Sequence, residues 1–191
     1  MRQDVADRMS ASSRDFATLV WPLIRTKLGG GTIDVVESVT ASGTAKKLDV
    51  LAGIDVWQYL DGGMRGIASR VQWCGDRPHR EWPFRTFTVR KSRPSGSPTE
   101  WQKRLEAVTQ PASGLLYPHL TVQAYVRRRG QGPVDAVGVV KTGDLVWHLV
   151  IVGARTRTAP SGEVFYHVTW DELRSVKGVD VFEASSARKV A

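Results

Sequence analysis

Three carboxylates stand in or beside apolar, strand-like segments in the first third of the chain, at Glu37, Asp49 and Asp55. Asp is depleted in strands, yet Asp55 lies between Ile54 and Val56, which marks it out most strongly. Mg²⁺ takes oxygen ligands, and one or two carboxylates with a substrate phosphate usually hold it. The bound ion polarises a phosphodiester and lowers the pKa of an attacking water. We therefore predict a Mg²⁺ or Mn²⁺ site at these three acids, with acids on the solvent face of a sheet as the simpler alternative.

The positive charge is concentrated in the middle of the chain. The net charge is +8, and between residues 65 and 104 ten Lys or Arg residues accompany only three acids. A basic surface of this kind favours a polyanionic partner, most simply DNA, because guanidinium groups fork onto phosphates. The alternative is a strand with solvated cations and its aromatic side chains in the core. The expected nucleic-acid contacts are Arg85, Arg90, Lys91, Arg93, Lys103, Arg104, Arg127 and Arg128.

The hydrophobic pattern indicates the elements that position these residues. Helical periodicity covers residues 4–28, and β-branched or alternating segments at 32–40, 48–60 and 64–73 predict a three-strand antiparallel meander. A strand over 84–93, a helix after Thr99 and strands over 119–128 and 135–142 follow, whereas 143–154 fits either a helix or a strand. This order predicts one α/β (α+β) domain over residues 1–183, with a central mixed sheet flanked by helices, and a disordered tail at 184–191.

Composition narrows the class of protein. No run of about 18 apolar residues is present, so we expect no transmembrane helix, and the first twenty residues lack the apolar core of a signal peptide. Cys74 is the only cysteine, which excludes an intrachain disulfide and a cysteine-based zinc site. These features suit a reducing cytoplasm.

The segment from Gly53-Ile54-Asp55 to the following strand, "GIASRVQW", resembles the core of the PD-(D/E)xK nuclease superfamily, also called restriction-endonuclease-like. In that family a helix precedes a β-meander, an Asp ends the second strand and the third strand carries Glu-x-Lys or Gln-x-Lys. The resemblance implies that Asp55 binds the metal and that Gln72 takes the place of the Glu or Gln.

The sequence departs from this pattern at Cys74, which stands where the family has Lys. A cysteine cannot stabilise the attacking water or the phosphate as a cation does. One other register places Gln72 itself at the Lys position, with Arg70 two residues before it. A further alternative is that the cation comes from Arg70, which shares a strand face with Gln72, or from Lys91 on the next predicted strand.

These features lead to a first hypothesis of metal-dependent hydrolysis of DNA phosphodiester bonds, with Asp55, Gln72, Arg70 and Lys91 as the catalytic residues. A homodimer would suit a nuclease that cuts both strands. The alternatives are a catalytically inactive nucleic-acid-binding module of the same fold, or a basic domain of a phage or mobile element that binds an acidic protein. Whether the protein is an enzyme therefore stays open at this point, because no residue replaces the missing lysine unambiguously.

Overall fold

The helical N-terminal segment forms one wall of the molecule. The computed structural model describes residues 3–36, 52–75, 85–96 and 98–186. Helix α1 (Gln3–Asp15) continues through a π-helical turn (Phe16–Val20) into the short helix α2 (Trp21–Ile24). Pro22 lies in the first turn of α2, where its missing N–H removes no required hydrogen bond. This confirms the predicted helical stretch as far as Ile24.

The main sheet contains six strands in the order β1-β2-β3-β5-β6-β9. The predicted meander is present, because β2 pairs antiparallel with both β1 and β3. Strand β5 then runs parallel to β3, while β6 and β9 are antiparallel to their neighbours, so the sheet is mixed as predicted. The strand bounds are β1 (Thr32–Val35), β2 (Val56–Leu60), β3 (Gly63–Trp73), β5 (Leu120–Val126), β6 (Val134–Lys141) and β9 (Phe182–Ala184).

The predicted strand over 84–93 does not join this sheet. Strand β4 (Thr86–Ser92) pairs with β8 (Val164–Thr169), which pairs with β7 (Arg155–Thr158), and the three form a second antiparallel sheet. The side chains from Thr86 to Val89 are all buried, so this end of β4 has no exposed face. The reason is tertiary: Thr86 and Thr88 contact β5 of the main sheet, whereas Phe87 and Val89 pack in the hydrophobic core that includes Trp170, so both faces are covered.

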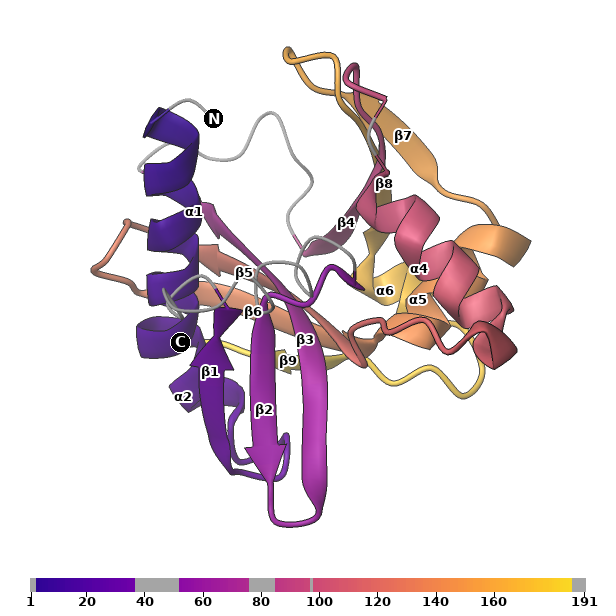
Figure 1. Ribbon diagram of the computed structural model, residues 1–191. Helices are drawn as coiled ribbons and strands as arrows, with labels where there is room; N and C mark the ends of the chain where they lie inside the picture. Colours follow the sequence, from indigo (N-terminus) through magenta and orange to yellow (C-terminus); the bar gives the residue numbers. More distant parts are fainter. Residues whose placement is uncertain (1–2, 37–51, 76–84, 97, 187–191) are drawn as a thin grey trace.

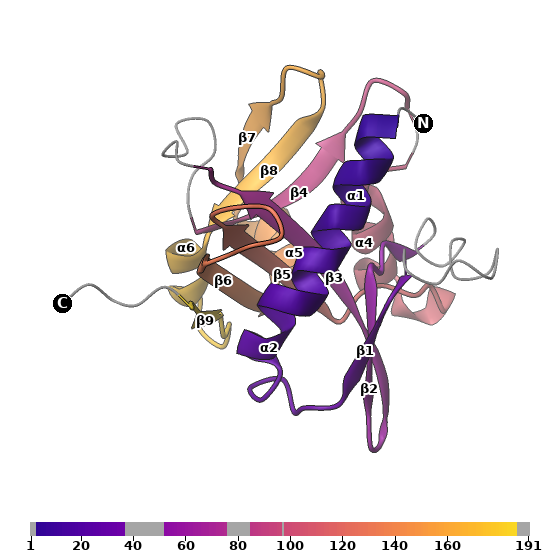
Figure 2. The same cartoon turned by 90° about the vertical axis from the view of Figure 1, so that its left-hand side faces the viewer.

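Helices α4 (Glu100–Thr109), α5 (Thr142–Ile151) and α6 (Trp170–Arg174) lie on the side of the main sheet opposite α1, together with the second sheet (Figures 1 and 2). A 3₁₀ turn (Pro111–Ser113) follows α4. The undecided segment 143–154 is thus mainly helical. Thr99 caps α4 with a reciprocal hydrogen-bond pair to Gln102, as its position before the helix predicts.

Two hydrophobic cores fill the two faces of the main sheet. Ile67 and Val71 of β3 pack in the core beneath α1, and Ala68 and Arg70, at the alternate positions, face the opposite side by the two-residue period of a strand. On β5, Val122 belongs to the α1 core and Tyr125 to the second core. Polar residues at alternate positions of β3 and β5 are therefore directed toward α4 and β4.

Two further expectations need correction. Strand β2 begins at Val56, because Gly53 adopts a positive φ of 65° that interrupts extended backbone, and residues 48–51 of the predicted strand lie outside the described residues. The tail expected from residue 184 is placed as far as Ser186, whose backbone N–H donates to the Val134 carbonyl at 3.0 Å. Among the described residues, no helix combines the length and the apolarity that crossing a membrane requires.

Candidate functional site

A small polar cavity lies on the face of the main sheet opposite α1. Its volume is about 20 Å³, which is room for roughly one water molecule. We call it the Asp55 cavity, after the acid that the sequence singled out. Strands β3, β4 and β5, helix α4 and the residue before β2 supply its walls, which comprise Asp55, Ala68, Ser69, Arg70, Thr88, Glu100, Arg104, Thr121, Val122 and Gln123.

Asp55 is fixed by its backbone and its side chain. Its N–H donates to the Ile67 carbonyl at 3.0 Å, and its carbonyl accepts from the Val36 N–H at 2.9 Å. Its carboxylate Oδ2 accepts a hydrogen bond of 2.6 Å from the backbone N–H of Ser69. Because Val36, directly after β1, and two residues of β3 hold this residue, the carboxylate is aligned against the middle of β3. The predicted acid therefore reaches a structured polar cavity and is not a solvated side chain.

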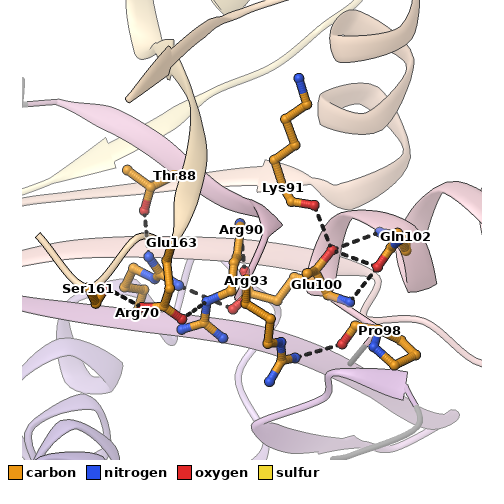
Figure 3. A network of polar contacts seen from close by, with 11 residues as sticks. Arg70, Thr88, Arg90, Lys91, Arg93, Pro98, Glu100, Gln102, Ser161 and Glu163 are labelled. Atoms are coloured by element: carbon orange, nitrogen blue, oxygen red, sulfur yellow. Dashed lines mark hydrogen bonds and ion pairs between the residues drawn. The ribbon is translucent and has the colours of Figure 1, made fainter. Parts of the chain in front are cut away.

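Arg70 is one of the two cations that line this cavity. Its Nη2 lies 3.1 Å from Glu100 Oε1, and its Nη1 donates to the Thr88 hydroxyl at 3.1 Å. The guanidinium carbon also lies 5.2 Å from the centre of the Phe165 ring. Figure 3 shows Arg70 and Thr88 within this network of contacts, which also includes Glu100 from α4. The guanidinium is thus held from three directions, as a positioned group would be.

Glu100 is the second carboxylate of the cavity, and it is held ionised. Burial opposes its ionisation most strongly, but Arg70, Arg104 and Arg90 together outweigh burial and lower its pKa to about 2. The backbone N–H of Arg90 also donates to Oε2 at 3.4 Å. The charge of Glu100 is therefore balanced by neighbouring guanidinium groups over the whole physiological range.

Arg104 lies one helical turn after Glu100 and on the same face of α4. Only 4% of it is exposed, and burial lowers its pKa, while the carboxylates of Glu100 and Asp55 act in the opposite direction. Its Nε and Nη1 have no hydrogen-bond partner within the described part of the chain. The sequence predicts Arg104 as a phosphate contact, and the structure buries its side chain in the cavity wall instead of exposing it on the outer surface.

Gln72 does not line the Asp55 cavity. Val56 pairs with Ile67, so the antiparallel register sets Asp55 beside Ala68, and Gln72 lies four residues further along β3, about 13 Å away. Gln72 instead pairs with Tyr125 of β5. The residue two places before it, Arg70, lies on the same face and does reach the cavity. The structure therefore brings Asp55 and Arg70 together, but not Asp55 and Gln72.

The other predicted site residues lie elsewhere. Lys91 is not part of the cavity wall: its ammonium lies 4.9 Å from the centre of the Tyr166 ring, and Figure 3 shows the side chain directed away from Glu100. Cys74 follows β3, where burial raises its pKa to about 11, with a smaller contribution from Asp135. The predicted metal ligands Asp49 and Glu37 fall outside the described residues.

Several of the predicted DNA contacts already have protein partners. Arg85 pairs with Glu183 at 2.8 Å, and Arg90 pairs with Glu163 at 2.9 Å. Arg93 Nη2 donates to the Pro98 carbonyl at 2.6 Å, and Arg127 lies 2.6 Å from Asp135. Arg128 is exposed and Lys103 is half-buried. Arg85 and Arg127 are exposed, and exposed ion pairs contribute little to stability, so these two arginines can exchange their partners for phosphates at small cost.

Two cavity residues were not singled out by the sequence. Glu100 looked like an ordinary acid in the first turn of a helix, where the helix dipole favours it. Thr88 looked like one residue of an alternating strand. Gln123 did carry a signal, because an amide in an apolar strand must find a partner, and its Oε1 accepts from the Thr88 hydroxyl at 3.1 Å. The one sequence signal for Glu100 was its position one helical turn before Arg104, on a helix that Thr99 caps.

No protein-family model, curated protein or solved structure matches this chain. The resemblance to PD-(D/E)xK nucleases therefore stays a prediction, and the chemistry of the cavity has to be inferred from its own residues. That cavity combines two carboxylates, two guanidinium groups and an amide, all supplied by neighbouring elements of one fold.

Proposed function

We propose that the protein is a metal-dependent nuclease-like protein that binds DNA and hydrolyses its phosphodiester bonds at the Asp55 cavity. The observation that carries this proposal is the meeting of Asp55 and Arg70 from adjacent parts of the meander at one cavity. The resemblance implies an acid at the first position, and it requires a nearby cation. Arg70 supplies that cation in place of the lysine that Cys74 replaces.

The donor chemistry of the cavity fits Mg²⁺ or Mn²⁺ through Asp55. The described residues contain no group of three or more acidic, His or Cys side chains suited to a metal ion. Mg²⁺ nevertheless needs only one or two carboxylates when a substrate phosphate completes its shell. Asp55 would hold the ion, and Glu100 would stay with Arg70. When bound, the ion would polarise the phosphodiester and lower the pKa of a water molecule.

Arg70 would act on the phosphate itself. A guanidinium that is already fixed by Glu100 and Thr88 needs little reorganisation when negative charge develops on a phosphate. The basic residues of β4 and the neighbouring loops would hold the DNA backbone, which is consistent with the net charge of +8. In this proposal the cavity stabilises the negative charge that develops on the phosphate, and the basic surface provides the affinity for DNA.

The charge balance of the cavity favours a second candidate, a DNA-binding protein of the same fold without hydrolytic activity. Asp55 and Glu100 are matched there by Arg70 and Arg104, so these four groups sum to zero and attract a cation less than two free carboxylates would. This candidate predicts binding that needs no metal and weakens with salt, with a log–log slope of about −0.9 for each phosphate contact.

The two candidates are separated by one set of reactions. Purified protein is incubated with supercoiled plasmid, single-stranded DNA and branched DNA, each with Mg²⁺, Mn²⁺ or EDTA. The variants are Asp55→Asn and Asp61→Asn; Asp61 is exposed in the β2–β3 turn and serves as a control that removes the same charge. Cleavage that requires metal and Asp55 supports the first candidate. Salt-sensitive gel retardation without cleavage on any substrate supports the second and refutes hydrolysis.

A further inference from the structure

The Asp55 cavity has open hydrogen-bonding groups that the proposed metal site does not use. Arg104 is 4% exposed and Gln123 is 1% exposed, and both line the cavity. Arg104 Nε and Nη1 and Gln123 Nε2 have no hydrogen-bond partner in the part of the chain that the structure describes. Buried N–H groups are almost always paired in folded proteins, so three such atoms on two residues that line one cavity point to a ligand that supplies the acceptors.

The neighbouring contacts determine which end of the Gln123 amide is open. The Arg70 guanidinium can only donate, so the Thr88 hydroxyl accepts from it at 3.1 Å. The Thr88 hydroxyl then gives its own proton to Gln123 Oε1, also at 3.1 Å. Gln123 Nε2 is left as the open group. Thr121 offers no alternative, because its hydroxyl is paired with that of Thr142 at 2.9 Å.

Size and charge define the ligand. All the open groups donate, and two of them belong to a guanidinium, so the ligand must accept hydrogen bonds, and an oxygen that carries negative charge accepts them most strongly. A volume of about 20 Å³ admits one oxygen atom and not a whole phosphate group. A phosphate with its phosphorus at the mouth of the cavity and one oxygen inside meets both conditions.

We propose that Arg104 and Gln123 bind one non-bridging oxygen of a DNA phosphate inside the Asp55 cavity. The inference rests on the proposed function only for the source of that phosphate, the DNA backbone. It gives Arg104 a substrate-binding role distinct from that of Arg70, whose guanidinium is occupied by Glu100 and Thr88. It also places the phosphate beside Asp55, where the proposed metal would be held.

The test follows the Arg104 side chain directly. In protein with ¹⁵N-labelled arginine, the Nε–Hε signal of Arg104 is assigned as the one lost in Arg104→Lys. Inorganic phosphate and, separately, a short DNA duplex and its single strand are added in EDTA. We expect a saturable shift of this signal with phosphate, and the same signal shifting with DNA in competition with phosphate. DNA that binds by gel retardation without moving the Arg104 signal would overturn the proposal, as would an equal response to chloride.

A second variant guards against misfolding of Arg104 substitutions. Gln123→Glu places a carboxylate beside Arg104, where it takes the open N–H groups itself. We expect it to fold and to bind phosphate at least about tenfold more weakly, the effect of losing one charge-assisted hydrogen bond. Arg25→Gln, at an exposed residue after α2, changes the net charge equally and should leave phosphate binding intact. Undiminished phosphate binding by folded Gln123→Glu contradicts the proposal.

This outcome is independent of the cleavage assay. If phosphate and DNA move the Arg104 signal but no DNA is cut, the anion site stands and the hydrolytic function fails. If Asp55-dependent cleavage is found while the Arg104 signal stays still, the anion site fails and the hydrolytic function stands.

Discussion

Substitution of Glu100 by Gln should destabilise the protein by about 3 kcal/mol at pH 7. The carboxylate is surrounded by Arg70, Arg104 and Arg90, which lower its pKa from 4.5 to about 2. Each pKa unit corresponds to about 1.4 kcal/mol of preference for the ionised form in the folded state. The side chain is only 26% exposed, so solvent screening removes little of this preference. Gln keeps the shape of the side chain and removes the charge.

The pH dependence follows from the direction of the shift. Because the folded-state pKa is lowered, the contribution of Glu100 is fully present above its unfolded pKa of 4.5 and is lost as the pH falls toward about 2. The difference between wild type and Glu100→Gln should therefore shrink from about 3 kcal/mol at pH 7 to about 2 kcal/mol at pH 3.5.

Urea unfolding at pH 7, 5 and 3.5 measures this difference, provided that the m-value is unchanged. Glu106→Gln is the matched control, since Glu106 is exposed on the same helix, and it should change the free energy of unfolding by less than about 0.5 kcal/mol. The reasoning about Glu100 and its neighbouring arginines would be refuted if Glu100→Gln lost no more free energy of unfolding than the control, or if its loss grew as the pH fell.

Two further predictions concern packing and thiol chemistry. Gly138→Ala should destabilise the protein by at least about 2 kcal/mol, because the new Cβ would lie 2.3 Å from the buried Trp170 ring. Gly143→Ala in α5 is the control: its Cβ meets no atom within 4 Å, so this variant should be neutral or stabilising. Thermal unfolding compares the two variants. Equal melting temperatures would contradict the packing of α6 on β6. Cys74, with a pKa of about 11, should react with iodoacetamide far more slowly than free cysteine at pH 8, and its rate should rise up to about pH 11; rapid alkylation at pH 8 would contradict its burial.

The local parts of the fold were predictable from the sequence. The meander follows from alternating segments with short turns. Thr99 predicts the start of α4, because a capping side chain acts within one helical turn. Placement of β4 was not predictable, because a strand of Thr, Phe and Val fits either sheet until its partner is known. Its pairing with β8 joins residues far apart in the sequence.

The residues of the candidate site likewise separate into those that a local sequence pattern predicts and those that depend on tertiary packing. Asp55 was found because an acid among apolar residues is a local conflict that the sequence displays. Arg70 was recognised only as one of several alternatives, since its approach to Asp55 depends on the register of β2 against β3. The roles of Glu100 and of the buried Arg104 depend on how α4 packs against β4, and no local pattern specifies that. Gln72 was favoured over Arg70 because the family motif, and not the register, guided the choice.

The central claim is that Asp55 supports metal-dependent hydrolysis, and the rate of plasmid nicking tests it most directly. Initial rates are measured against Mg²⁺ and Mn²⁺ concentration for the wild type, Asp55→Asn and the control Asp61→Asn. We predict saturable dependence on the metal, no activity in EDTA, a rate at least about 100-fold lower in Asp55→Asn and an unchanged rate in Asp61→Asn. Equal nicking by the wild type and Asp55→Asn, or no nicking at any metal concentration, would contradict the claim.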